Sequence, residues 1–117
     1  MPVRSLGSAV LKWPARKDVL AAARVWAAEL RFHDPNLVHV LCVGSCARGD
    51  YGVGSDLDVI VIVRTAPDSL VERRRDYEPQ GIPVPVDVTV LTQVEWSAFA
   101  EKSPLLWRRL QREMIEL

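Results

Sequence analysis

The run from Asp56 to Val63, DLDVIVIV, constrains the fold of this chain more than any other segment. Apart from its two aspartates every residue is apolar, and most are the β-branched residues that fit a pleated strand. A strand that is apolar on both faces has to be covered on both faces. The run therefore predicts a central strand of a sheet that packs against helices.

Two further strands are predicted, one before and one after this run. Leu37 to Val43 is short, rich in valine and leucine, and bounded by the turn signal Asp34-Pro35-Asn36 and by Gly44. Val86 to Leu91 follows a proline-rich loop and alternates in the way that is typical of a strand with one apolar face. We therefore expect three strands.

Helical periodicity fills most of the remaining chain, because apolar residues recur there at three- and four-residue spacing. The predicted helices are Ala15 to about Phe32, Pro67 to about Asp76, a segment from Thr92 through Trp96 and Phe99, and Ser103 to Leu117. The opening stretch, Met1 to Pro14, fits neither period and is predicted to be a short strand or an ordered arm. The expected fold class is α/β (α+β), a small three-stranded mixed sheet flanked by about four helices.

The lengths of the connections predict which strand ends meet. Only eleven residues separate Gly44 from Asp56, too few for a parallel crossover, so the first two strands are expected to be antiparallel. The longer segment before Val86 has room for a helix and a return, so the third strand can lie parallel to the central one. The residues that then converge on one edge of the sheet are Gly44, Ser45, Asp56, Asp58 and Asp87.

Each of these residues also has an ordinary explanation when it is taken alone. Gly44 and Ser45 could hold a phosphate at the start of a short helix, but a glycine and a serine there more often form a turn and a cap. Asp56 and Asp58 could be a solvated strand entrance. Asp87 could be an exposed residue on the polar face of a half-buried sheet.

Together, the residues predict phosphoryl-transfer chemistry. Asp56 and Asp58 stand two apart on a strand, so they share a face, repel each other and favour a cation such as Mg²⁺. A phosphate-binding turn that faces three carboxylates is the arrangement that two-metal chemistry needs. Asp56 and Asp58 would bridge the metals, while Asp87 would hold the catalytic metal and could accept the proton of an attacking hydroxyl.

The spacing of these motifs resembles that of the polymerase-beta nucleotidyltransferase superfamily: Gly44-Ser45, ten residues, Asp56-Leu57-Asp58, and Asp87 on a later strand. The short length and the form Gly-Ser-x-Ala-Arg-Gly are similar to those of the minimal nucleotidyltransferase (MNT) proteins of bacteria and archaea. The resemblance covers about Val38 to Leu91. It implies that two Mg²⁺ ions and ATP, or another nucleoside triphosphate, are used to transfer a nucleoside monophosphate to an acceptor hydroxyl.

The resemblance also assigns roles to individual residues. Gly44 and Ser45 match the triphosphate-binding turn, and Asp56, Asp58 and Asp87 match the metal-binding and catalytic carboxylates. Arg48 matches the motif arginine, whose guanidinium could reach a phosphate or anchor the short helix to a nearby carboxylate.

Many MNT proteins are encoded beside a helical HEPN protein and act as its antitoxin by adding AMP to it, so the resemblance implies a HEPN-type partner. The alternative is a non-catalytic binding module that neutralises a partner sterically. The aromatic residues Trp96, Phe99 and Trp107 could form a docking face, although each taken singly is expected in the core. A small-molecule or RNA acceptor remains a third hypothesis.

Charge and composition limit the other possibilities. Fifteen basic residues balance fifteen acidic ones, so no overall field draws the chain to nucleic acid or to an anionic membrane. The run Arg73-Arg74-Arg75 and the residues Arg108, Arg109 and Arg112 could contact RNA, but such residues are more typical of solvated helix faces. Cys42 and Cys46 are expected to be buried free thiols rather than a redox pair. With no apolar run long enough to span a membrane and no signal peptide, one cytoplasmic domain over residues 1–117 is expected.

Overall fold

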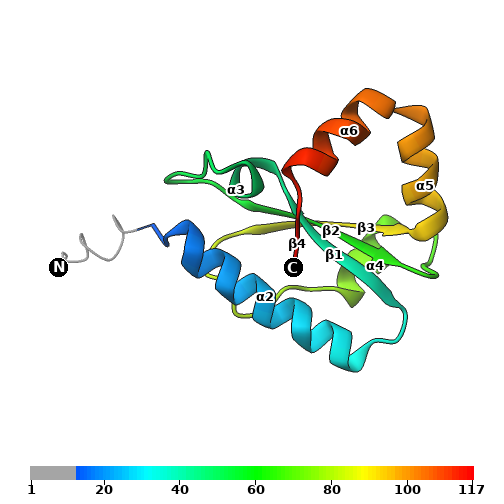
Figure 1. Ribbon diagram of the computed structural model, residues 1–117. Helices are drawn as coiled ribbons and strands as arrows, with labels where there is room; N and C mark the ends of the chain where they lie inside the picture. The colour runs from blue at the N-terminus through cyan, green and yellow to red at the C-terminus, as the bar shows by residue number, and fades with distance from the viewer. Residues whose placement is uncertain (1–12) are drawn as a thin grey trace.

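The computed structural model describes residues 13–117 and shows a sheet between two layers of helices (Figure 1). Helix α2 covers one face of the sheet, and α5 and α6 rise from the other (Figure 1). The prediction of an N-terminal strand or arm falls almost wholly on residues 1–12, which lie outside the described residues. Within residues 13–117, no helix is long and apolar enough to cross a membrane.

The predicted helices and strands are found, with small shifts at their ends. In chain order the elements are α2 (Arg16–His33), β1 (Leu37–Val43), α3 (Gly44–Arg48), β2 (Leu57–Val63), α4 (Leu70–Asp76), β3 (Val86–Thr92), α5 (Gln93–Lys102), α6 (Pro104–Glu113) and β4 (Ile115–Glu116). Helix α4 begins later than the predicted Pro67, because the side chain of Ser69 accepts a hydrogen bond from the backbone N–H of Glu72 and caps the helix there.

The strand directions follow the predictions. The sheet order is β3-β2-β1-β4, so β2 is central. Strands β1 and β2 are antiparallel, and β2 and β3 are parallel. The start of β2 therefore lies between the end of β1 and the start of β3.

The prediction of a three-stranded sheet and of a helix reaching Leu117 is wrong. Helix α6 ends at Glu113, and β4 pairs with β1 in an antiparallel ladder. The backbone N–H of Leu117 donates to the carbonyl of Val40 at 2.9 Å, and its side chain is buried. The free edge of β1 offers backbone partners to the end of the chain, and these tertiary contacts override the helical spacing of the apolar residues.

The core lies between α2 and one face of the sheet. Helix α2 contributes Val19, Leu20, Ala23, Trp26 and Ala27, and the sheet contributes Val40, Cys42, Leu57, Val59, Val61, Val63, Val88 and Val90. Cys42 and Cys46 are both buried and free, as predicted. Burial and the adjacent Cys46 raise the pKa of the Cys42 thiol to about 12, so at neutral pH it is protonated and unreactive.

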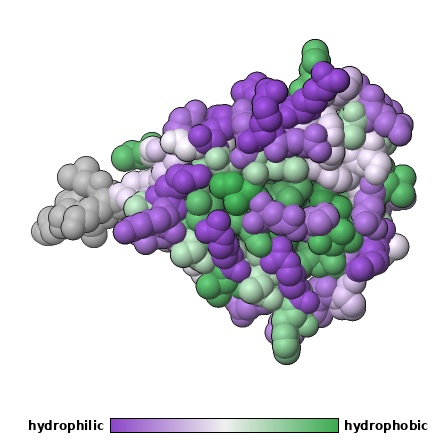
Figure 2. Space-filling view, in the orientation of Figure 1, coloured by the Kyte–Doolittle hydropathy of each residue, from purple (hydrophilic) through white to green (hydrophobic). Residues whose placement is uncertain are grey.

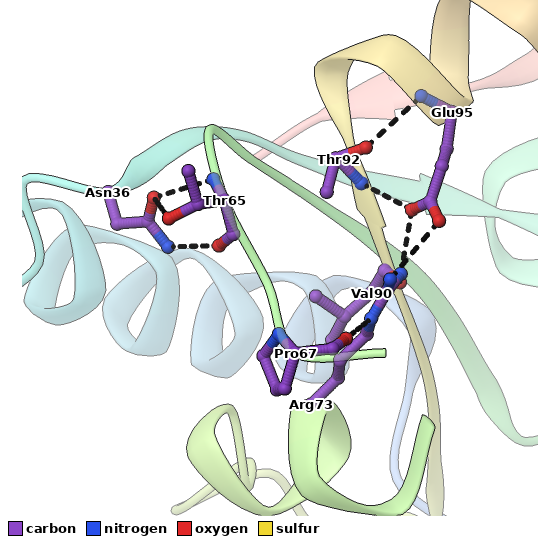
Figure 3. Close-up of polar contacts among 7 residues, drawn as sticks. All are labelled: Asn36, Thr65, Pro67, Arg73, Val90, Thr92 and Glu95. Carbon is purple, nitrogen blue, oxygen red and sulfur yellow. Dashed lines mark hydrogen bonds and ion pairs between the residues drawn. The ribbon is translucent and has the colours of Figure 1, made fainter. Parts of the chain in front are cut away.

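Arg73 joins three elements from a buried position (Figure 3). Its guanidinium donates to the carbonyls of Pro67 and Val90 and to both carboxylate oxygens of Glu95, at 2.6 and 3.1 Å. Glu95 is also part of a capping box with Thr92 at the start of α5. The prediction that the run of three arginines is solvated is therefore wrong for Arg73, which is 5% exposed. Arg74 and Arg75 are exposed, as predicted.

Glu95 gives the fold a pH dependence that can be measured. Hydrogen bonds from Arg73, and then from the backbone of Thr92, lower its pKa to about 2. A carboxyl whose pKa in the folded state lies below its unfolded value of about 4.3 stabilises the fold above that value, and this contribution is lost as the pH falls toward the folded pKa. Between about pH 5 and pH 2, we expect Tm to fall more steeply for the parent than for Glu95→Gln. Calorimetry of the parent and of Glu95→Gln across this pH range measures the two changes in Tm. Glu101→Gln, at an exposed position, is the control. An equal fall of Tm with pH for the parent and Glu95→Gln would refute this prediction.

Candidate active site

The turn at Gly44 brings the end of β1 directly against Asp58. Gly44 adopts φ +76°, a left-handed conformation that residues with a side chain rarely adopt. A Cβ placed on Gly44 would lie 2.4 Å from the Oδ2 atom of Asp58, which is far inside contact distance. The position therefore requires glycine for both its backbone angle and its close approach to the carboxylate.

Strand pairing places Asp87 on the other side of Asp58. Asp58 is paired with Val43 on β1 and with Asp87 on β3, and Asp56 immediately precedes β2. Asp87 is exposed whereas Val88 is buried, so Asp87 lies on the sheet face away from α2, as the alternation predicts. Four of the five predicted site residues, Gly44, Asp56, Asp58 and Asp87, thus lie along one sheet edge, with Ser45 next to Gly44.

The carboxylates at this edge influence one another. Burial raises the pKa of Asp58 above its ordinary value, and the negative charges of Asp87 and then Asp56 raise it further. The positive charge of Arg48 acts in the opposite direction. The site therefore concentrates negative charge around a half-buried carboxylate, a situation that a bound cation relieves.

These residues fit Mg²⁺ as an open site rather than as a closed cage. Within residues 13–117, no three side chains of His, Cys, Asp or Glu come close enough to hold an ion jointly. Asp58 is half-buried and fixed against Gly44, while Asp56 and Asp87 are exposed. Mg²⁺ suits carboxylate oxygens, retains waters and completes its shell with substrate phosphates, so a donor set of this kind is appropriate for an ion that binds together with a nucleotide.

Arg48 lies at the C-terminal end of α3 and is partly exposed. Its Nε lies 3.4 Å from Oδ2 of Asp50, two residues further along the chain. This contact matches the anchoring role that the sequence left open, but a pair so exposed contributes little stability. The guanidinium therefore remains available for a phosphate, and its charge already acts on Asp58.

Two arginines that were not predicted to belong to the site contact its residues or the short helix beside it. Arg16, in the first turn of α2, donates to the carbonyls of Cys46 and Ala47 and so ties α3 to α2. Arg74 lies 3.6 Å from the Oδ1 atom of Asp87 and donates to the carbonyl of Val86 at 3.4 Å. Nothing in the sequence distinguishes Arg74 from the arginines on either side of it.

A surface groove opens beside Asp87, between α4 and the free edge of β3. Its volume is about 280 Å³. The residues that line it are Leu70, Val71, Arg74, Asp87, Val88, Thr89 and Val90. Asp87 therefore lies between the carboxylate edge and this groove.

Replacing Gly44 by alanine tests the close approach at the turn. We expect Gly44→Ala to displace the Asp58 carboxylate and to lower the free energy of unfolding by about 2 kcal/mol or more, since a left-handed alanine alone costs about 1–2 kcal/mol. The matched control is Gly49→Ala, because Gly49 has φ +92° but a Cβ added there would meet nothing within 4 Å. Gly49→Ala should lose stability only, whereas Gly44→Ala should also lose the nucleotidyl transfer that the resemblance implies. Equal activity in the two variants would contradict this description of the turn.

Comparison with known proteins identifies a family and a similar fold. The sequence profile of the family described as "Nucleotidyltransferase domain" matches residues 26–114. The fold is similar to the crystal structure of "a putative nucleotidyltransferase from Sulfolobus solfataricus", with a TM-score of 0.58 and 21% identity over 91% of this chain and 89% of that one. No curated protein matches the sequence. The profile covers the whole carboxylate edge, and the structural match shows that the fold is shared.

Proposed function

The chain belongs to the nucleotidyltransferase domain family, and we propose that it transfers AMP from ATP, with Mg²⁺, to an acceptor hydroxyl. The observation that carries this proposal is the packing of the Gly44 backbone against Asp58, with Asp87 beside it in register. A turn with free backbone N–H groups next to clustered carboxylates can hold a triphosphate and its cations side by side. We place this activity in the cytoplasm, where nucleoside triphosphates are available.

The residues divide the work of the reaction between them. Asp56, Asp58 and Asp87 would hold Mg²⁺, which when bound neutralises charge on the phosphates and stabilises the transition state. The backbone of Gly44 and Ser45 would receive the triphosphate, and the Arg48 guanidinium would bind its oxygens. The acceptor oxygen attacks the α-phosphorus, the bond to the bridging oxygen breaks, and pyrophosphate leaves. Asp87 accepts the proton of the acceptor hydroxyl and passes it to solvent.

We propose a HEPN-type helical protein as the acceptor, with this chain as the antitoxin of the pair. The supporting feature is an aromatic cluster between α5 and α6, with ring centroids 5.8 Å apart for Trp96 and Phe99 and 4.7 Å for Trp96 and Trp107. These rings are half-buried, so the cluster is not fully covered by the rest of the chain described here. Partly exposed aromatic side chains are typical of the anchors of a protein interface.

An RNA acceptor has less support. On α6, Arg109 pairs with Glu113 of the same helix at 3.2 Å. On α4, Arg73 is buried and Arg74 lies against Asp87. These arginines therefore do not form a continuous basic surface for a polyanion. The net charge of the whole chain is also zero.

The enzymatic and steric accounts of neutralisation can be separated. The chain is incubated in cell lysate with a HEPN-type partner and ATP labelled at the α-phosphorus, and partner toxicity is assayed in parallel. We expect Asp56→Asn with Asp58→Asn to abolish both labelling and neutralisation. If that variant is unable to label but neutralises as well as the parent, the chain acts as a binding module. If the parent labels a component of the lysate other than this partner, the acceptor class is wrong but the chemistry stands.

A further inference from the structure

Helix α2 carries a second apolar stripe, on the side opposite the core. Its members are Ala21, Val25, Ala28 and Phe32, and all four are exposed. Val25 is 61% and Phe32 is 84% exposed. Their spacing of four, three and four residues is that of a seam between two paired helices. Figure 2 shows the molecule from the same side as Figure 1, and α2 lies on the side that is seen. Apolar residues are exposed there among hydrophilic ones.

Charged residues border this stripe in two rows of opposite sign. At 100° per residue, Lys17, Arg24 and Arg31 fall along one side of it, and Asp18 and Glu29 along the other. All five are exposed, and none of them forms an ion pair with another residue in the range 13–117. The stripe is therefore bounded by charges that have no counterpart on the described surface.

The two charged rows of one α2 helix are complementary to those of a second α2 helix. When two copies of α2 lie face to face and parallel, related by a two-fold axis along their length, the basic row of each lies along the acidic row of the other. Arg24 of one copy then meets Glu29 of the second copy, because flanking residues five positions apart pair in a parallel seam. An antiparallel pair would instead place basic row against basic row, which is unfavourable.

We propose that this chain forms a two-fold dimer through parallel pairing of α2 with α2 of a second copy. Val25 and Phe32 of each copy meet their own counterparts along the seam. Helix α2 lies on the side of the sheet away from α5 and α6 (Figure 1), and Asp58 and Asp87 lie on the sheet face away from α2. The dimer therefore leaves both carboxylate edges open. With a seam of only four residues per copy, the dimer is expected to be reversible and to depend on protein concentration.

Cross-linking at Val25 tests the parallel geometry. In a parallel two-fold pair a cysteine at this position faces its own copy, so Val25→Cys should form a disulfide-linked dimer under mild oxidation. The matched control is Val53→Cys, because Val53 is 84% exposed but lies outside α2. Native Cys42 and Cys46 are buried in both variants. Cross-linking of Val25→Cys no faster than that of Val53→Cys would overturn the proposal.

Charge exchange tests the pairing of Arg24 with Glu29 without any cross-link. Arg24→Glu and Glu29→Arg each place like charges opposite each other, and should each raise the dimer dissociation constant about five- to tenfold in sedimentation experiments at low salt. An equimolar mixture of the two variants restores both pairs, so it should dimerise as well as the parent. If the mixture is as weak as the separate variants, α2 does not pair in this way. These substitutions are on the surface, and Tm values equal to that of the parent at a protein concentration low enough to keep all of them monomeric establish that the fold is kept.

Discussion

Replacing Asp58 by asparagine is expected to reduce nucleotidyl transfer at least about a hundredfold while leaving the fold intact. Asparagine keeps the shape of the side chain beside Gly44 but removes the charge that would hold the cation. Burial and two neighbouring carboxylates oppose ionisation of Asp58. Removing the negative charge of Asp58 should therefore leave Tm at neutral pH unchanged or raise it. Steady-state transfer rates and calorimetry of parent and variant measure the two effects separately.

The control for this substitution is Asp76→Asn, an exposed aspartate at the end of α4. It should retain parental activity and Tm. Addition of Mg²⁺ and ATP should raise the Tm of the parent and of Asp76→Asn, but have much less effect on Asp58→Asn. Parental activity in Asp58→Asn would remove this carboxylate from the site.

Replacing Arg73 by alanine is expected to lower the free energy of unfolding by about 3 kcal/mol. Breaking a buried ion pair by removing one partner costs about 3–5 kcal/mol, and the lower end applies because the Glu95 side chain is 43% exposed and can be hydrated. The carbonyl of Val90 loses a donor as well. Urea unfolding followed by tryptophan fluorescence measures the change.

Arg75→Ala is the matched control, because Arg75 is two residues further along the same helix and exposed. Its substitution should change the free energy of unfolding by no more than about 0.5 kcal/mol. Equal effects of the two substitutions would mean that the hydrogen bonds of Arg73 drawn in Figure 3 do not stabilise the packing of α4 against β3 and α5.

Much of the topology could be predicted from the sequence, because connection lengths restrict strand direction. The short link from Gly44 to Asp56 excludes a parallel crossover, and the long link to Val86 permits one. Strand β4 could not be predicted, since Ile115 and Glu116 carry no strand signal and pair only because β1 has a free edge. The three consecutive arginines of α4 could not be separated either, because burial of Arg73 depends on Glu95, which is distant in sequence.

The composition of the candidate site was more predictable than its details. Spacing and strand direction predicted that Asp58 lies between Gly44 and Asp87. The strand pairing agrees, because Asp58 is opposite Val43 on β1 and opposite Asp87 on β3. The contact of Arg74 with Asp87 was not predictable, because it depends on how α4 packs along the edge of β3. The tie from Arg16 to α3 likewise depends on where the N-terminal end of α2 lies in the fold.

The most direct test of the proposed chemistry compares ATP labelled at the α-phosphorus with ATP labelled at the γ-phosphorus. Each is incubated with the chain, Mg²⁺ and the acceptor, beside Asp58→Asn. Nucleotidyl transfer predicts α-label on the acceptor, an equal amount of γ-label released as pyrophosphate, and neither with Asp58→Asn. Label from the γ-position on the acceptor, or α-label transferred equally by Asp58→Asn, would contradict a nucleotidyltransferase site at this edge of the sheet.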